Sequence, residues 1–264
     1  MTPDPSLAHP QTPFDIRLRR LHLADIARWL ALGTRDFARA PGIGLFYGGC
    51  FALMGWALLA VYERAAVHVL TLSAGFLLMG PLLCMGLYSV SQQLERGQRP
   101  DFGDSLLAWT TRTGTLAIFG FVLLVLEMLW SRTALVIFAV SFSGMPDFKG
   151  SLAALLDPDN LGFIVAYLGA GALFAGLIYA VSVVAIPMIL DRQTDAITAG
   201  LTSLRLVLAQ PLVLLAWGAT ITALVVLALL PWFLGLLVVG PVLGHASWHA
   251  YRAAVVDGND APAA

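Results

Sequence analysis

The chain has 264 residues, of which 59% are hydrophobic and 12% are charged, and its formal net charge is −1. A soluble domain is typically about 45–50% apolar and about 25% charged, so these charges are too few to cover the surface of a water-soluble globule. The composition excludes a soluble enzyme, a disordered chain and a nucleic-acid binder with a basic face. It predicts a polytopic helical membrane protein.

Six apolar segments reach or approach the roughly 20 residues that a helix needs to cross the hydrocarbon core of a bilayer. We therefore predict an all-α membrane bundle of six transmembrane helices, at about 43–62, 66–90, 114–142, 161–190, 212–230 and 232–248. These helices form one membrane domain over 17–255, between disordered tails over 1–16 and 256–264. Only Pro231 separates the last two segments, which predicts a tight hairpin.

Basic residues indicate the orientation of these helices. Twelve of the fifteen lie on the side of the N-terminus, and the three on the other side are Arg64, Arg132 and Lys149. Because loops rich in arginine and lysine stay in the cytoplasm, we expect both termini to be cytoplasmic.

Short amphipathic helices are predicted between the spans. One apolar stripe at helical spacing runs through 23–38 and another through 197–208, each beside arginines. Such a stripe fits a helix lying in the cytoplasmic interface, and it also fits a helix packed under the bundle. A third, shorter helix is expected over 151–156 on the outer side.

An internal repeat relates the first and last parts of the chain. Arg35 precedes Pro41 by six residues and Arg205 precedes Pro211 by six, so each amphipathic helix leads through a proline into a span. With a weaker echo at Pro187, the pattern predicts three helical-hairpin units.

Pairs of glycines four residues apart favour close helix packing in lipid. They occur as Gly44 with Gly48 and as Gly240 with Gly244. The partner helix can belong to the same chain or to a second copy.

Glu127 is the one carboxylate well inside a predicted span, and Arg132 follows it by five residues. A charge inside the hydrocarbon is costly and marks a functional site by default. Five residues is a poor separation for a helical ion pair, so a structural residue near the outer interface is the other interpretation.

His245 and His249 share one face of the sixth segment, near its cytoplasmic end. They fit interfacial anchors that bond to headgroups or carbonyls. They could instead bind a metal if a third ligand converged on them, and Asp191 is the candidate third ligand. The other histidines do not suit haem binding, and we expect no bound metal or cofactor.

Motifs of soluble catalysis are missing from the sequence. It has no phosphate-binding Walker loop, no H-E-x-x-H and no G-x-S-x-G. The two cysteines, Cys50 and Cys84, lie in apolar runs and fit packing residues.

Four stretches of the sequence resemble a bacterial family of integral membrane proteins catalogued as domain of unknown function 2189. They read DFARAPGIGLFYGG, GPLLCMGLYSVSQQLERG, IPMILDRQTDAITAGLTS and GPVLGHASWHAYR. The resemblance covers about 17–255 and implies a six-helix protein of the inner membrane with no established activity.

We expect a non-catalytic membrane scaffold or assembly partner, because the spans are almost wholly apolar. The alternative is a permease for a small or amphipathic solute, and an intramembrane enzyme ranks third. Expected partners are membrane lipids and other membrane proteins, not nucleic acid. A polar cavity lined by Glu127 and tyrosines would favour the permease, whereas an apolar core with a lipid-facing groove would favour the scaffold.

Overall fold

The computed structural model describes residues 12–14, 16–65, 69–141, 160–192 and 194–256, and within these ranges the regular elements are helices. The side chains of 65, 69–78 and 81 lie outside the description. Helices of the N-terminal half are α1 (Leu23–Arg39), α2 (Pro41–Ala65), α3 (Val69–Glu95), α4 (Phe102–Leu107), the 3-10 helix η3 (Ala108–Arg112) and α5 (Thr113–Ser141). Those of the C-terminal half are α7 (Leu161–Ser182), α8 (Ala185–Arg192), α9 (Ala196–Ala209), α10 (Pro211–Leu229) and α11 (Leu236–Ala254).

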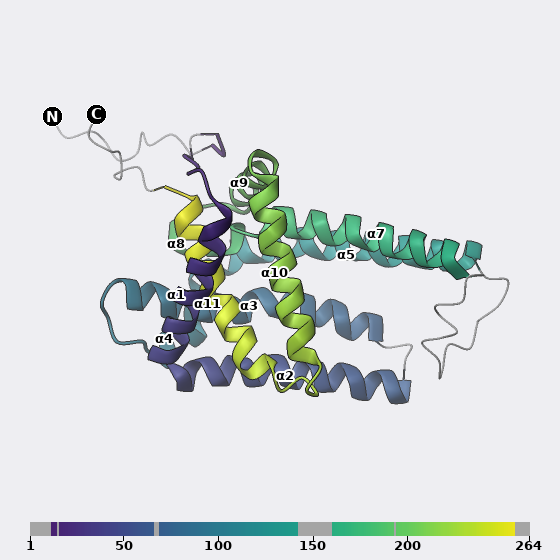
Figure 1. Cartoon of the computed structure of the whole chain (residues 1–264), viewed down its shortest axis with the longest axis horizontal. Coiled ribbons are helices and arrows are strands. Elements are labelled where there is room, and N and C mark those ends of the chain that lie inside the picture. The colour runs from purple at the N-terminus through teal and green to yellow at the C-terminus, as the bar shows by residue number, and fades with distance from the viewer. Residues whose placement is uncertain (1–11, 15, 66–68, 142–159, 193, 257–264) are drawn as a thin grey trace.

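Four long helices lie lengthwise in the molecule and three others run across them. In Figure 1, α2 and α3 form one arm and α5 and α7 another, whereas α1, α10 and α11 run across these arms at one end. We predicted a bundle of six membrane-spanning helices. The crossing of α10 and α11 is a feature of the packing that apolar segments alone do not reveal.

Four helical stretches are long and apolar enough to cross a membrane, at Pro41–Arg64, Phe102–Ser141, Leu161–Arg192 and Pro211–Leu229. α3 is not among the helices assessed over their full length, because some of its side chains lie outside the described part of the chain. α11 is too polar in its second half, where histidines, a serine and an arginine follow the apolar start. The chain is therefore an all-helical protein with several candidate spans, and the number six remains a prediction.

Two predicted spans differ in detail from the observed helices. The predicted segment 161–190 is broken between α7 and α8, three residues before Pro187. A proline lacks a backbone N–H and its ring clashes with the carbonyl four residues earlier, which accounts for the break. The predicted sixth span starts at 232, but α11 starts at Leu236, because Trp232 and Phe233 take positive φ values of 54° and 64° in the turn after Pro231.

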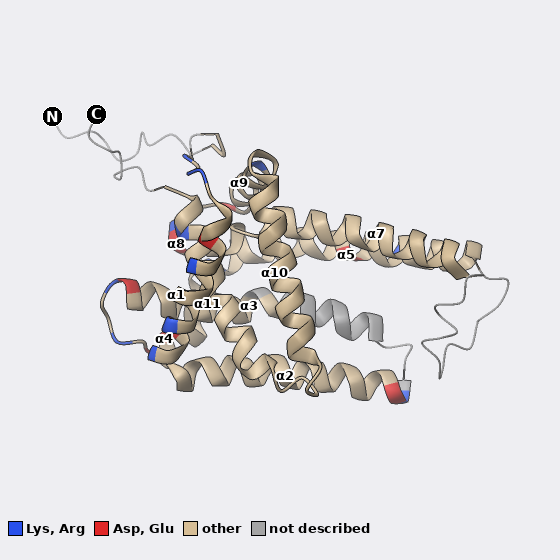
Figure 2. Ribbon diagram, in the orientation of Figure 1, with Lys and Arg blue, Asp and Glu red and all other residues tan. Residues whose placement is uncertain are grey.

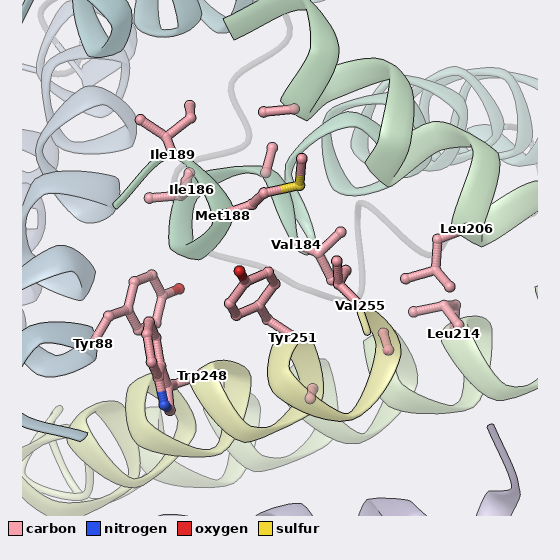
Figure 3. Packing of buried hydrophobic residues seen from close by; sticks show 14 of the residues in the cluster. Tyr88, Val184, Ile186, Met188, Ile189, Leu206, Leu214, Trp248, Tyr251 and Val255 are labelled. Atoms are coloured by element: carbon pink, nitrogen blue, oxygen red, sulfur yellow. The ribbon is translucent and has the colours of Figure 1, made fainter. Parts of the chain in front are cut away.

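The core lies where α1, α8, α9, α10 and α11 meet. Figure 3 shows Tyr88, Trp248 and Tyr251 packed beside Met188 and Ile189 of α8. On the other side of α11, Trp29 of α1 meets Trp217 of α10 edge-on, with ring centroids 5.5 Å apart. Ile16 is also buried, although it falls in the predicted N-terminal tail. The predicted tails otherwise lie largely outside the described residues.

The predicted amphipathic helices exist as α1 and α9, but each buries a different face from its apolar stripe. In α9 the stripe residues Ile197, Leu201 and Leu208 are 69%, 47% and 72% exposed, while small and hydroxyl side chains face the protein. α1 likewise buries Trp29, Gly33 and Asp36. An apolar stripe that faces away from the protein fits a helix in the membrane interface better than one packed under the bundle. The predicted helix at 151–156 lies outside the described residues.

The joints that lead into α2 and α10 have nearly the same backbone geometry. Ala40 has φ −134° and ψ 56°, and Gln210 has φ −138° and ψ 56°. Each residue precedes a proline, which disfavours helical geometry at the preceding residue. The first and third predicted units thus enter their spans through connections of the same backbone geometry, whereas the three-unit repeat itself remains a prediction.

All four glycines of the two predicted pairs face other parts of the same chain. A Cβ atom at Gly48 would collide with the backbone of Leu237, one at Gly240 with the ring of Phe51, and one at Gly244 with the side chain of Leu87. At Gly44 it would meet the ring of Phe37 in α1. These contacts favour the intramolecular interpretation, since they join α11 closely to α2 and α3.

Candidate functional site

A cluster of polar side chains joins α1, α3, α8 and α11 at the end of the molecule where charged residues gather (Figure 2). We call it the polar joint and define it by Asp36, Ser91, Gln92, Glu95, Asp191, His245, His249, Tyr251 and Arg252. The sequence predicted His245, His249 and Asp191 as site residues, and the structure places all three in this joint.

Ser91 is the centre of the buried half of the joint and is 0% exposed. Its hydroxyl donates to Asp36 Oδ2 at 2.9 Å, and its Oγ lies 2.8 Å from His245 Nδ1. Because a serine hydroxyl has only one proton, its oxygen must accept from Nδ1–H of His245. This assigns the Nδ1-protonated tautomer to His245 and leaves Nε2 as a buried lone pair.

His249 lies between two carboxylates. Its Nε2 is 2.7 Å from Asp36 Oδ2, and its Nδ1 is 3.6 Å from Glu95 Oε1. Burial alone would raise the pKa of Asp36, but the hydrogen bonds from His249 and Ser91 and the nearby charge of His249 outweigh it and lower the pKa. Asp36 is therefore held as a carboxylate that fixes α1 against α11.

Asp191 anchors the other half of the joint, at the end of α8. It accepts from Gln92 Nε2 at 2.9 Å and from the Tyr251 hydroxyl at 2.7 Å, and it lies 3.4 Å from Arg252 Nη1. Arg252 also contacts Glu95, with Nε 3.4 Å from Oε2. Asp191 thus binds α3 and α11 rather than completing a set with the two histidines.

The joint contains a serine, a histidine and an aspartate in contact, yet their order is not that of a nucleophilic triad. In such a triad the histidine lies between the serine and the aspartate, whereas here Ser91 lies between His245 and Asp36. Ser91 is also fully buried. In the described part of the chain, no group of three His, Cys, Asp or Glu residues is arranged to hold a metal ion. The hydrogen bonds of the joint connect α1, α3, α8 and α11 to one another.

Glu127 and Arg132 lie on α5, far along the chain from this joint. Glu127 is partly buried and Arg132 is exposed. No ion pair joins the two among the described residues. The five-residue separation on one helix accounts for the lack of this ion pair, and neither residue belongs to the polar joint.

An apolar groove with a volume of about 410 Å³ lies between α3, α5 and α8. Phe119, Leu123 and Ile186 form its buried floor, and Phe121 is an exposed residue at its side. Leu82, Trp109, Thr113, Leu116, Ala117, Gly120 and Leu124 complete its lining. A groove of this composition can hold an acyl chain or an apolar helix face.

A polar cavity of about 450 Å³ lies along the same helices, toward the end of α3. Its charged lining consists of Arg96, Arg112, Asp104 and Asp191. The remaining lining residues are Ser89, Gln92, Leu107, Ala108, Thr110, Thr111 and Leu190. Asp191 therefore belongs to both the polar joint and this polar cavity.

Sequence reasoning did not single out Asp36, Ser91 or Glu95. Asp36 is 213 residues from His249, so only the packing of α1 on α11 brings them together. One signal was available, because Asp36 shares a helix face with Trp29 and Gly33, two residues that do not fit the polar side expected opposite the apolar stripe.

Comparison with known proteins gives one family and no close relative. Residues 69–191 match the family described as "Predicted integral membrane protein (DUF2189)". No curated protein and no solved structure matches the chain. The matched segment contains every residue that lines the apolar groove and the polar cavity. The resemblance predicted from the sequence is thus confirmed over residues 69–191, a segment that is similar to a family of integral membrane proteins whose description states no activity.

Proposed function

We propose that the protein is a non-catalytic scaffold of the bacterial inner membrane that holds a hydrophobic neighbour in the apolar groove. The neighbour is a lipid or an apolar helix of an assembly partner. One observation carries the proposal: the groove opens beside α5, which belongs to the candidate span Phe102–Ser141, and only 6% of the apolar stretch of this span is buried inside the molecule. A span this exposed has its side chains free to contact other molecules in the bilayer.

The polar groups of the molecule support a scaffold more than a permease. Those of the polar joint are engaged in bonds that hold helices together, as Asp36 and Asp191 illustrate. Glu127 lines neither the groove nor the polar cavity. A solute path would instead need polar groups that converge on one cavity at membrane depth.

A photo-reactive amino acid placed in the groove tests the scaffold in living cells. At position 124 it should give a discrete adduct with one molecular species, because Leu124 lines the groove. The matched control is position 173 on α7, where Leu173 is 62% exposed and lies outside the groove lining. Equal, diffuse labelling at both positions would overturn the proposal.

Six spans with both termini in the cytoplasm complete the proposal. The charge bias of twelve to three supports it. Because α10 and α11 run across the other long helices (Figure 1), this topology requires that pair to be tilted relative to them. Reporter fusions after Gly97 and after Ala264 should report the cytoplasm, and one after residue 146 the periplasm. A periplasmic signal after Ala264 would refute the six-span topology.

A further inference from the structure

We propose that the apolar groove and the polar cavity together form one binding site for a phospholipid with a primary-ammonium headgroup, of the phosphatidylethanolamine type. This inference rests on the proposed function, since it names the molecule that the groove holds. The groove would take an acyl chain, and the polar cavity would take the phosphate and the ammonium.

The two hollows follow the same helix faces. Leu82 of α3 lines the groove, and Ser89 of α3 lines the polar cavity seven residues later, on the same helix face. Arg96, a further seven residues on and directly after the end of α3, also lines the polar cavity, and its backbone N–H still bonds to Gln92 in the helical pattern. On α8, Ile186 lines the groove and Leu190, one turn later, lines the polar cavity. On both helices the residues that line the apolar groove therefore come before those that line the polar cavity. A single amphiphilic molecule has the same arrangement, with an apolar chain at one end and a charged headgroup at the other.

The polar cavity has matched groups for both charges of a zwitterion. Arg96 and Arg112 offer guanidinium donors to a phosphate, and Arg112 is only partly exposed. Asp104 offers carboxylate oxygens to an ammonium, and Asp191, whose oxygens already accept from Gln92 and Tyr251, adds its negative charge to the lining. An anionic headgroup would leave these two carboxylates opposed to a negative charge.

The hydroxyls of the polar cavity also favour a ligand that donates hydrogen bonds. Thr110 donates its proton to the carbonyl of Leu107 at 2.7 Å, and Thr111 donates its proton to that of Ala108 at 3.0 Å. Their oxygens can then only accept. A primary ammonium has three N–H donors, whereas a choline headgroup has none and a glycerol headgroup has no cation.

The test uses the purified full chain, stripped of lipid in detergent. Ethanolamine, choline and glycerol phospholipids with identical acyl chains are titrated, and binding is followed by native mass spectrometry and by the melting temperature. We expect the ethanolamine lipid to bind at least tenfold more tightly than the other two. Equal or tighter binding of the glycerol lipid would overturn the zwitterionic assignment, and equal binding of the choline lipid would overturn the ammonium contacts.

Two variants with matched controls locate the lipid. Arg112→Gln should weaken binding of the ethanolamine lipid about tenfold, and Arg99→Gln, outside the cavity lining, should leave it unchanged. Ala117→Trp fills the groove and should also weaken binding, whereas Ala172→Trp on an exposed position of α7 should not. Melting temperatures without lipid verify that each variant is folded. If Arg112→Gln unfolds the chain, Arg96→Gln replaces it, since Arg96 is exposed and lines the same cavity.

A further experiment distinguishes binding of the whole lipid from binding of its headgroup alone, and it distinguishes the lipid site from the scaffold role. Glycerophosphoethanolamine, which has no acyl chains, should bind far more weakly than the lipid; equal affinity would refute the part played by the groove. A protein adduct at position 124 with no lipid selectivity in the titration would leave the scaffold standing and overturn this inference. Lipid selectivity lost in Arg112→Gln, with no distinct adduct at position 124, would instead separate the lipid site from the proposed scaffold role.

Discussion

The pairs α1–α11 and α5–α7 are packed by opposite means. Where α1 crosses α11, Gly33 lies against the backbone of Val242 and Ala246, and the buried Asp36 bonds to His249. In the α5–α7 arm, large rings pack between exposed apolar faces, with the Trp130 and Tyr167 centroids 5.2 Å apart. The α1–α11 contact depends on a glycine that has no side chain and on a buried carboxylate with a fixed partner. It therefore tolerates almost no substitution. The α5–α7 contact depends on rings that can shift, which suits a surface that contacts lipid.

The largest effect is expected where two backbones meet. Gly48→Ala would place a Cβ against the backbone of Leu237, which cannot move aside as a side chain can. Overpacking typically costs about 1–3 kcal/mol and occasionally more. Because the added Cβ meets backbone that cannot repack, we expect a cost above this range and the largest fall in melting temperature in detergent. The neighbouring Gly49→Ala is the matched control, because nothing lies within 4 Å of its added Cβ. Equal melting temperatures for the two variants would mean that α2 and α11 do not meet at Gly48.

The next largest effect is expected at Asp36. Asp36→Ala would leave Ser91 and His249 without their shared acceptor in a buried site, and removing one member of a buried pair costs about 3–5 kcal/mol. His249→Gln keeps a side chain that can donate to Asp36, so it should cost less. The free energy of unfolding in a mild detergent is the measurement. A smaller loss for Asp36→Ala than for His249→Gln would contradict the central place given to the carboxylate.

The same carboxylate predicts how stability depends on pH. The folded pKa of Asp36 lies below its ordinary value of 3.8, so its contribution is complete above that value and is lost as the pH falls through the folded pKa. Asp195 also has a lowered pKa: burial opposes this, but bonds from Thr198 and Ile197 outweigh it. Thermal melts between pH 6 and pH 3 should therefore show falling stability below about pH 4, as these carboxylates become protonated. Asp36→Asn should flatten part of that fall, and an unchanged slope would refute the lowered pKa.

A moderate effect is expected in the α5–α7 arm. Trp130 contacts both Tyr167 and Phe174, and its ring lies over Gly171. Aromatic pairs contribute about 0.5–1.5 kcal/mol beyond burial. Because Trp130 is only partly buried, its removal opens no closed cavity, so Trp130→Ala should lower stability less than Asp36→Ala does. Trp130→Phe retains a ring and should recover part of the loss. A loss larger than that of Asp36→Ala would reverse the comparison between the two regions.

The sequence predicted the regular parts of both regions and missed what depends on packing. Apolar length placed the long helices, and the prolines at 41 and 211 marked two of their starts, because a proline acts locally along the chain. The orientation of α10 and α11 across the other helices depends on where glycines such as Gly33 and Gly48 find partners, and that is a property of two helices at once. The acceptor shared by Ser91 and His249 was missed for the same reason. No sequence pattern predicted the polar cavity, because its four charged residues come from three separate segments of the chain.

The smallest effect is expected on removing metal ions, and it bears on the pair of histidines that the sequence singled out. Each histidine already has a protein partner, His245 through Ser91 and His249 through Asp36. A metal bound by both histidines would have to displace the bond between His249 and Asp36. Asp191, the predicted third ligand, is held instead by Gln92 and Tyr251. Treatment with a chelator should therefore leave the melting temperature unchanged, and elemental analysis should find no stoichiometric transition metal. One bound ion per chain, lost in the double variant His245→Gln with His249→Gln, would show that the polar joint is a metal centre and that α1 and α11 are held together by coordination.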